Sequence, residues 1–528
     1  MVSWNTIPAI MKVRLLSCLC CLFVACAAPQ PDTASRPSRL IIGYDREPDT
    51  MNRFSTHILE DIQSCIIEGL TTTDEHMNTI PVLAEVVPSL DNGLVGLRAD
   101  GGMDVTWKLR PNIKWHDGQA FSSADVKFTV DAIHNPNWKP ESTDGFDRIS
   151  SVDTPDPLTV VVHYKERYAP FETQFLRGAL PKHLLEGRDI ERAVDYNRAP
   201  LGTGPYRLKE WKAGEYIVLE RVENYWRGSQ YPVIGELVFR FLTNQNTRIQ
   251  ALRAGEVQLV GTLPWDKVPE VEKIPGIQIH KTAANSYEHF SLNERTVPAF
   301  RDKRVRQGLA YAIDRDSLTK TILYGLTPVI HSPIQPMSWA SNPNVKTYSY
   351  DPERARELLS EAGWKDRLSF TLITLAGNVV RERMAQAIQA QLKDVGVDMK
   401  IQLFDSTTLG QMWFEGRFDA FMANWTMPSD PEITLFFAGD RTPPRGRNIN
   451  YYSNPSVDKL LYLSDQTIER DKRRDLLFRA QEMIAEDVPE LFLYNRTFLD
   501  AIPENLENFR GNPTNIGIFW NVHEWRFR

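Results

Sequence analysis

The 528-residue sequence lacks the features that would mark several large classes of protein. Four of its five cysteines, Cys18, Cys20, Cys21 and Cys26, lie near the N-terminus, so Cys65 is alone in the body of the chain and a structural disulfide there is excluded. Lys and Arg number 61 against 68 Asp and Glu, without a long basic run, which disfavours a nucleic-acid partner. No apolar run reaches the roughly 18–20 residues that a membrane-spanning helix needs.

The sequence also lacks the common motifs of catalysis and metal binding. It has no phosphate loop, no GxGxxG, no GxSxG and no HExxH, and its ten histidines are scattered. His116-Asp117-Gly118 is more simply a turn than a general-base pair. Asp419 and Asp430 form a candidate carboxylate pair, although acids spaced like this usually cap helices or meet water. We therefore expect no catalytic residue, no metal site and no cofactor.

What is present is typical of a folded protein of several lobes. Hydrophobic residues make up 42% and charged residues 24%, and the length allows about three domains of roughly 150 residues each. Short β-branched runs at 158–163 and 216–220 predict strands, whereas 122–133 and 351–363 carry capping residues and apolar spacing that predict helices. Residues 384–404 predict a helix, a turn at Gly396 and a strand. This mixture favours α/β or α+β lobes.

The N-terminus has the layout of an export signal. Lys12 and Arg14 precede an apolar run over 15–25, so we expect residues 1–25 to form a signal peptide with its natural start at Met11. The segment Phe23-Val24-Ala25-Cys26 resembles a bacterial lipoprotein box, although leucine is usual where Phe23 stands. The box implies that Cys26 carries lipid and that residues 26–38 form an extended tether to a membrane. Ordinary cleavage near Ala27 or Ala28, with Cys26 discarded, is the alternative.

Motifs along most of the chain resemble those of the extracytoplasmic solute-binding protein family 5, the peptide- and nickel-binding receptors of ABC importers. The matching segments, in the family's order and spacing, are WKLRPNIKWHDGQAFSSADVKFTV at 107–130, PLGTGPYRLKEWKAGEYIVLERVENYW at 200–226, ALRAGEV at 251–257, DKRVRQGLAYAID at 302–314, residues 351–364, YSNPSVDKLL at 452–461 and PELFLY at 489–494. Most of these residues, such as Trp107 and Trp115, are expected to shape the fold rather than to bind a ligand.

The resemblance implies a two-lobed α/β fold of the periplasmic-binding-protein type, with an extra small subdomain, that closes on a hinge. The expected divisions are residues 39–82 and 203–282 for two parts of lobe I, 83–202 for its extra subdomain, 283–496 for lobe II, and 497–528 for a return to lobe I. A monomer in the periplasm or cell envelope is expected, anchored to a membrane through the lipid on Cys26.

The resemblance also implies a set of ligand-binding residues. Asn424 and Trp425 match the family's Trp-containing ligand segment, and Tyr287, His289 and Asn293 lie on a segment that lines the cleft in relatives. Peptide binders usually hold an aspartate three residues after this tryptophan, to pair with the ligand's ammonium group. Here Pro428 stands at that position, and Asp430 two residues later is the candidate replacement.

Three functions remain open from the residues. The first is the binding component of an ABC importer for oligopeptides or a similar small solute, with a permease and its ATPase as partners. The second is an extracytoplasmic sensor or chaperone that uses the same cleft. The third is a hydrolase, for which Asp430 with His289 is the least implausible catalytic pair.

Overall fold

The computed structural model describes residues 38–56, 61–143, 145–364 and 368–528, which form a mixed α/β structure. Ten strands make one sheet in the order β14–β13–β15–β12–β16–β11–β1–β10–β9–β8. Their bounds are β14 Asp398–Phe404, β13 Ser369–Leu375, β15 Ala420–Thr426, β12 Ile277–Leu292, β16 Glu490–Pro503, β11 Leu259–Val260, β1 Arg39–Tyr44, β10 Glu236–Phe241, β9 Tyr216–Arg221 and β8 Tyr206–Lys212.

Smaller sheets and helices complete the structure. The other strands are β2 Thr71–Thr73, β3 Thr79–Pro81, β4 Val95–Leu97, β5 Met103–Lys108, β6 Ile149–Asp156, β7 Thr159–Tyr164, β17 Leu506–Glu507 and β18 Arg526–Phe527. The α-helices are α1 Asp61–Ser64, α2 Ser123–Ile133, α3 Lys182–Leu185, α4 Val194–Arg198, α5 Gln245–Arg253, α6 Val268–Val271, α7 Lys303–Ala312, α8 Arg315–Ile322, α9 Pro352–Glu361, α10 Val379–Asp394, α11 Ser406–Glu415, α12 Thr434–Phe437, α13 Pro455–Gln466 and α14 Arg470–Asp487. No helix within the described ranges is long and apolar enough to cross a membrane.

The buried apolar side chains fall into two sets, which correspond to two lobes. Three clusters draw their buried members from residues between Leu40 and Ile274 together with the C-terminal part from Leu499 onward. Three others draw theirs from residues between Tyr287 and Tyr494. Each lobe therefore has its own core, as the two-lobed fold requires.

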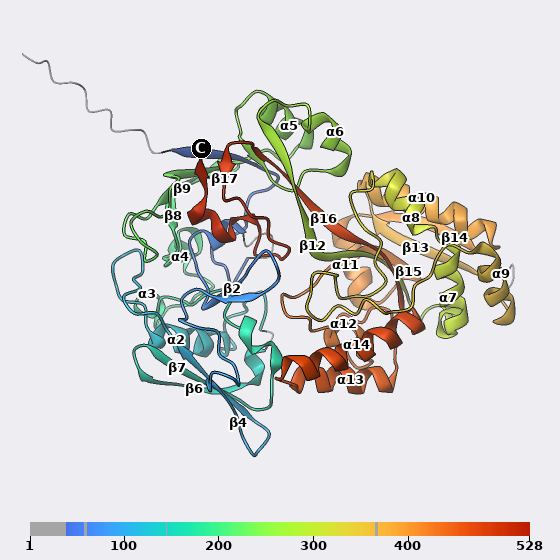
Figure 1. Ribbon diagram of the computed structural model, residues 1–528, viewed down its shortest axis with the longest axis horizontal. Coiled ribbons are helices and arrows are strands. Elements are labelled where there is room, and N and C mark those ends of the chain that lie inside the picture. Colours follow the sequence, from blue (N-terminus) through green and yellow to red (C-terminus); the bar gives the residue numbers. More distant parts are fainter. Residues whose placement is uncertain (1–37, 57–60, 144, 365–367) are drawn as a thin grey trace, which may run out of the picture. The chain divides into compact units, whose positions relative to one another are not determined.

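The strands β12 and β16 carry the chain from one lobe to the other and back (Figure 1). They pair antiparallel from Ile277 opposite Pro503 to Ser291 opposite Glu490, and this register is interrupted between Ala283 and Tyr287. An interruption of this kind bends a strand and weakens its ladder locally. The break lies where the chain passes between the two sets of core residues.

Local sequence signals account for several of these elements. Ser122 and Asp125 form the expected capping box of α2, and Asp351 caps α9 by accepting a hydrogen bond from the backbone N–H of Arg354. Helix α10 and strand β14 follow one another as expected, with Gly396 between them at φ +81°. The motif Gly202-Thr203-Gly204 marks a chain crossing, because a Cβ at Gly202 would lie 1.9 Å from the carbonyl oxygen of Ile66.

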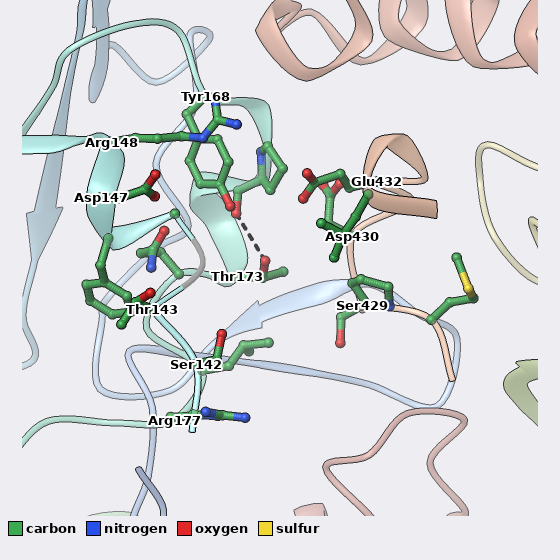
Figure 2. A pocket seen from close by; sticks show the side chains of 18 of the residues that line it. Ser142, Thr143, Asp147, Arg148, Tyr168, Thr173, Arg177, Ser429, Asp430 and Glu432 are labelled. Atoms are coloured by element: carbon green, nitrogen blue, oxygen red, sulfur yellow. Dashed lines mark hydrogen bonds between the residues drawn. The ribbon is translucent and has the colours of Figure 1, made fainter. Parts of the chain in front are cut away.

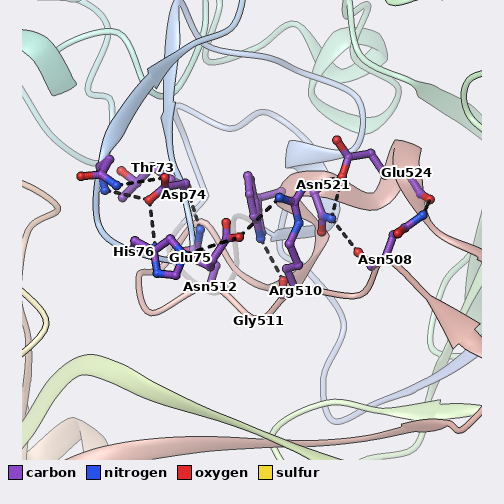
Figure 3. A network of polar contacts seen from close by, with 12 residues as sticks. Thr73, Asp74, Glu75, His76, Asn508, Arg510, Gly511, Asn512, Asn521 and Glu524 are labelled. Carbon is purple, nitrogen blue, oxygen red and sulfur yellow. Dashed lines mark hydrogen bonds and ion pairs between the residues drawn. The ribbon is translucent and has the colours of Figure 1, made fainter.

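The C-terminal segment is fixed to lobe I by a polar network (Figure 3). Asn512 donates a hydrogen bond of 2.7 Å to the carbonyl oxygen of Thr73, at the end of β2. Arg510 pairs with Glu75 at 3.4 Å and also with Glu524. These contacts hold residues 510–524 beside the β2–β3 hairpin, where the segment can contribute to the wall of a cavity.

Candidate functional site

A cavity of about 480 Å³ receives side chains from both lobes (Figure 2). The lobe I wall is formed by residues 53–54, 142–143, 145–148 and 514–516 and by side chains within 168–177, and the lobe II wall by side chains within 427–435, by Arg441 and Arg445, and by Asp465. Its volume lies within the ~300–1,000 Å³ of typical ligand sites. A second cavity of about 300 Å³ lies within lobe I and shares Arg53, Leu176 and Ile516 with the first.

The loop after β15 enters this cavity because a buried asparagine holds it. Asn285, at the interruption of β12, donates hydrogen bonds to the carbonyl oxygens of Met427 (3.0 Å) and Pro428 (2.7 Å). The backbone N–H of Met427 returns a hydrogen bond of 2.8 Å to the carbonyl oxygen of Asn285, whose own N–H donates to the carbonyl oxygen of Pro513. Asn285 therefore connects the interlobe strand to both walls of the cavity.

An ion pair dominates the lobe II wall. Arg473, on α14, donates from its two terminal nitrogens to the two carboxylate oxygens of Asp430, at 2.7 and 2.5 Å. The exposed fractions of these side chains are only 4% and 11%, so water compensates neither charge. The two-pronged geometry is the strongest arrangement available to arginine and a carboxylate. Asp430 thus lines the cavity with its charge already matched.

Glu432 lies beside this pair and also faces the cavity (Figure 2). Among the described residues, no donor makes a hydrogen bond or ion pair with its carboxylate. Burial raises the pKa of Glu432, and the nearby carboxylates of Asp465 and Asp430 raise it further. Burial likewise raises the pKa of Asp465. Three carboxylates therefore lie near Arg473 on the lobe II wall.

The lobe I wall presents arginines that have partners. Arg148 donates a hydrogen bond of 2.6 Å to Glu166, and its guanidinium lies 5.1 Å from the ring centre of Tyr168. Arg53 donates to the carbonyl oxygens of Leu176 and Ile67. This wall thus combines fixed guanidinium groups with an aromatic ring, a surface suited to polar and apolar parts of one ligand.

Of the residues expected to bind the ligand, Asp430 lies on the cavity wall. Asn424 and Trp425 lie on β15, just before the loop that lines the cavity. The side-chain oxygen of Asn424 accepts a hydrogen bond of 2.7 Å from Arg381. Trp425 is half-buried and stacks on His289, with parallel rings whose centres are 5.0 Å apart. The Trp-containing segment thus reaches the cavity through its later residues.

We expected Tyr287, His289 and Asn293 on the cleft wall, but the structure places all three in the core of lobe II. Their exposed fractions are 0%, and their partners are protein groups. Tyr287 donates to Glu490 (2.7 Å), Nδ1 of His289 lies 2.8 Å from the Ser291 hydroxyl, and Asn293 donates to the carbonyl oxygen of Phe418 (2.8 Å). The reason is that β12 is an interior strand of the sheet and both of its faces are covered, since Tyr287 belongs to one cluster of buried residues and Phe290 to another.

This placement also bears on the hydrolase alternative. His289 is fully buried, and burial together with the charge of Arg381 holds the pKa of His289 well below its usual range. Asp430 is engaged by Arg473 at the cavity. The two side chains have separate partners and do not form a catalytic pair in this structure.

Several cavity residues were not foreseen from the sequence. Glu432 lies two residues beyond Asp430 on the same segment, so extending the resemblance by two positions would have included it. Arg148, Tyr168 and Arg473 lie far from that segment in the sequence and carry no motif of their own. The proposed lipidation site, Cys26, lies outside the described residues. Within them, no group of three or more histidines, cysteines or acids is placed to hold a metal ion.

Comparisons with known proteins agree with this architecture. Residues 81–441 match the family model described as bacterial extracellular solute-binding proteins, family 5 Middle. The chain is 30% identical to the oligopeptide-binding protein AppA of Bacillus subtilis over 98% of both chains, and 28% identical to the glutathione-binding protein GsiB of Pectobacterium atrosepticum over 87% of this chain and 88% of that one.

Solved structures give the same result. The complex of Bacillus subtilis AppA with a nonapeptide is 29% identical, with a TM-score of 0.77 over 93% of this chain and 100% of that chain. The complex of NikZ from Campylobacter jejuni with Ni(L-His) is 26% identical, with a TM-score of 0.78 over 92% and 99%. The proteins in these comparisons bind solutes and are not enzymes. The chain therefore belongs to family 5 of the bacterial extracellular solute-binding proteins and is a substrate-binding component of an ABC importer.

Proposed function

We propose that this protein captures short peptides in the cavity between its lobes and delivers them to the permease of an ABC importer. The observation that carries the proposal is the 480 Å³ cavity, because each lobe supplies one wall and charged groups of both signs line it. A peptide carries an ammonium group, a carboxylate and a series of amides, so such a surface can match it along its length. The oligopeptide- and glutathione-binding relatives support the same class of ligand.

Binding acts through movement of the lobes about β12 and β16. The interrupted register between Ala283 and Tyr287 supplies a point at which the two strands can bend. Closing the walls over a ligand excludes water and strengthens each polar contact. Only a ligand with higher affinity for the closed form can shift the equilibrium toward it. The permease then receives a closed, loaded protein.

Cys26 anchors the mature protein, a monomer, to a membrane through lipid, with residues 26–38 as the tether. The sequence before and at Cys26 supports this part of the proposal. Changing Cys26 to Ser should release the protein from the membrane fraction and remove the mass of the lipid from its N-terminus. A serine variant that stays in that fraction would contradict the lipid anchor and leave the peptide-binding proposal untouched.

Native mass spectrometry tests the ligand directly. Protein purified without refolding should retain masses that fragment into amino acids, and titration calorimetry with tri- to nonapeptides should give saturable binding. Ser429→Trp, which fills the cavity, should abolish that binding, whereas Ser360→Trp on the exposed face of α9 should not. Retained masses without amino acids, together with no peptide binding, would refute the proposed ligand class.

Peptide uptake separates import from sensing. A strain that lacks this protein should lose uptake of a labelled peptide, and the unaltered protein should restore it. Unchanged uptake, with loss of a transcriptional response to the peptide, would favour the sensor.

A further inference from the structure

A second cavity lies within lobe I, beside the one between the lobes. Its volume is about 300 Å³, and the β2–β3 hairpin and residues 510–524 supply much of its lining. The side chains of Arg53, Leu176 and Ile516 line both cavities, so the two spaces are neighbours. A chain bound between the lobes can therefore extend into lobe I.

Arg227 is a charged group of this second cavity that has donors to spare. Its Nε donates a hydrogen bond of 3.1 Å to the Tyr225 hydroxyl, and its guanidinium carbon lies 4.5 Å from the ring centre of Trp226. Among the described residues, none accepts a hydrogen bond from its two terminal nitrogens and none forms an ion pair with it. Both nitrogens are therefore available to a ligand, and such a pair matches the two oxygens of a carboxylate.

Hydrogen bonds to Glu68 hold the two aromatic residues that position Arg227. Glu68 accepts from the Tyr225 hydroxyl (2.6 Å) and the Trp226 indole (2.8 Å). It accepts a third hydrogen bond, of 3.1 Å, from the Thr203 hydroxyl. Burial raises the pKa of Glu68, against the opposing effect of Arg227, and the two side chains form no ion pair. A guanidinium fixed in this way loses less conformational entropy when a carboxylate binds.

The remaining acids of this cavity have protein donors of their own. Asp74 accepts hydrogen bonds of 2.9 and 2.8 Å from two backbone N–H groups of its own turn. Glu75 and Glu524 both pair with Arg510 (Figure 3). Four acids and three arginines line the cavity, so no general preference for anions is expected. A carboxylate is favoured at Arg227, where the donors are unpaired.

We propose that Arg227 receives a carboxylate at the C-terminal end of peptides that are long enough to extend from the interlobe cavity into lobe I. This inference rests on the proposed function and adds to it a second binding site and a preference for longer peptides. The apolar surfaces of Ile80, Leu176 and Trp520 line part of the same cavity and can contact the last side chain of the peptide. A short peptide ends in the first cavity and does not reach Arg227.

The carboxylate can be the C-terminus itself or the side chain of an acidic last residue. Both present two oxygens to the terminal nitrogens of Arg227, so the chemistry at the site is the same for the two sources. Matched peptides distinguish them, because amidation removes the charge of the C-terminus and leaves the side chain intact.

The first test uses the unaltered protein and peptides of three, six and nine residues built from alanine and serine. Each is prepared with a free C-terminal carboxylate and as the C-terminal amide. Titration calorimetry should show about 10- to 100-fold tighter binding of the acid for at least one of the two longer lengths, as expected for charge-assisted hydrogen bonds, and less than about threefold for the tripeptide. Amides of the same lengths that end in Glu, compared with those that end in Gln, test the acidic side chain in the same way.

The second test changes Arg227. Arg227→Gln should lose most of the preference for the carboxylate, while binding of the neutral member of each pair changes less than about threefold. Arg227→Lys should keep part of the preference, because it retains the charge without the two-pronged geometry. Arg221→Gln is the matched control, since Arg221 pairs with Glu223 at 3.0 Å and lines neither cavity. That control should keep the full preference.

The outcomes separate this inference from the proposed function. If the unaltered protein binds both members of every pair equally well, the inference is refuted and peptide binding stands. If the tripeptide shows the same preference as the longer peptides, or if Arg227→Gln keeps the full preference, the carboxylate binds elsewhere and the inference fails. If no peptide of any length binds, the proposed function itself fails. Because the first test needs no variant, poor folding of Arg227→Gln would not prevent a decision.

Discussion

The two walls of the cavity differ in how their charges are compensated. The charged residues of the lobe I wall are three arginines and one aspartate, Arg53, Arg148, Arg177 and Asp147, and those of the lobe II wall are Asp430, Glu432, Asp465, Arg441 and Arg445. The arginines of lobe I have protein partners, such as Glu141 for Arg177 at 2.5 Å. The lobe II wall has one tightly paired acid beside acids whose pKa values are raised.

This difference indicates that the two lobes contribute differently to ligand binding. The arginines of the lobe I wall are fixed by their own protein partners. This wall can therefore shape the cavity without selecting the ligand by its charge. The lobe II wall keeps one carboxyl group, that of Glu432, without a hydrogen-bonding partner among the described residues, so a polar group of the ligand can bind to it. Selectivity within this cavity is therefore expected to depend mainly on lobe II.

The largest effect on the lobe II wall is expected from removing Arg473, the cation that pairs with Asp430. Arg473→Met leaves Asp430 buried without a partner and should lower the free energy of unfolding by about 3–5 kcal/mol. Denaturant titration measures the change. The neighbouring Arg474→Met is the control, because Arg474 is half-exposed and its ion pairs among the described residues are with Asp471 and Asp475 on its own helix, which are worth about 0–1 kcal/mol. Equal small losses in both variants would show that Asp430 is compensated by other means.

A second change separates the core of lobe II from its cavity wall. Trp425 stacks on His289 and meets Phe436 edge-on with ring centres 5.1 Å apart, yet it does not line the cavity. Trp425→Ala should therefore lower the free energy of unfolding by about 2 kcal/mol, below the ~3–5 kcal/mol of a fully buried aromatic residue, and should change peptide affinity less.

Thermal unfolding and calorimetry on the same variant decide the role of Trp425. The exposed Phe414 provides the control, since Phe414→Ala should change stability by less than about 0.5 kcal/mol. A loss of peptide affinity with unchanged stability would return Trp425 to the cavity wall, which is the position that the sequence predicts for it.

Local patterns in the sequence are sufficient to predict much of the fold. Ser122 and Asp125 predict the start of α2 because a capping box needs only residues three apart, and Gly396 predicts the turn before β14 for an equally local reason. The two-lobed arrangement is different, because it follows from long-range pairing of β12 with β16. It was predicted only through resemblance to a family, and the family match shows the resemblance to be correct.

The candidate site is harder to predict because its walls come from distant segments. Asp430 could be foreseen from its distance to Trp425, but Arg473 lies 43 residues later and meets it only through the packing of α14. Tyr287 and His289 show the converse problem. Alternation along a strand predicts two faces but not which of them is covered, and in β12 buried residues of two separate clusters cover both faces.

The smallest expected effect concerns how the protonation of Glu172 changes stability with pH. Glu172 is a half-buried residue of lobe I, and burial, with a further contribution from the carboxylate of Asp430, raises its pKa to about 7, against opposing effects of Arg470 and Arg473. Since the pKa in the unfolded chain is about 4.3, folding favours the protonated form. The stability that this group contributes is complete below about pH 4 and is lost as the pH rises through about 7.

Raising the pH from 5 to 8 should therefore lower the melting temperature of the unaltered protein more than that of Glu172→Gln, by about 1–3 °C. Glu490 and Asp500, whose pKa values burial also raises to about 7, contribute equally to both proteins and cancel in the difference. Glu85→Gln, at an exposed position, should follow the unaltered protein. Parallel pH profiles for the unaltered protein and Glu172→Gln would mean that Glu172 stays solvated, and the acidic cluster would then belong to lobe II alone.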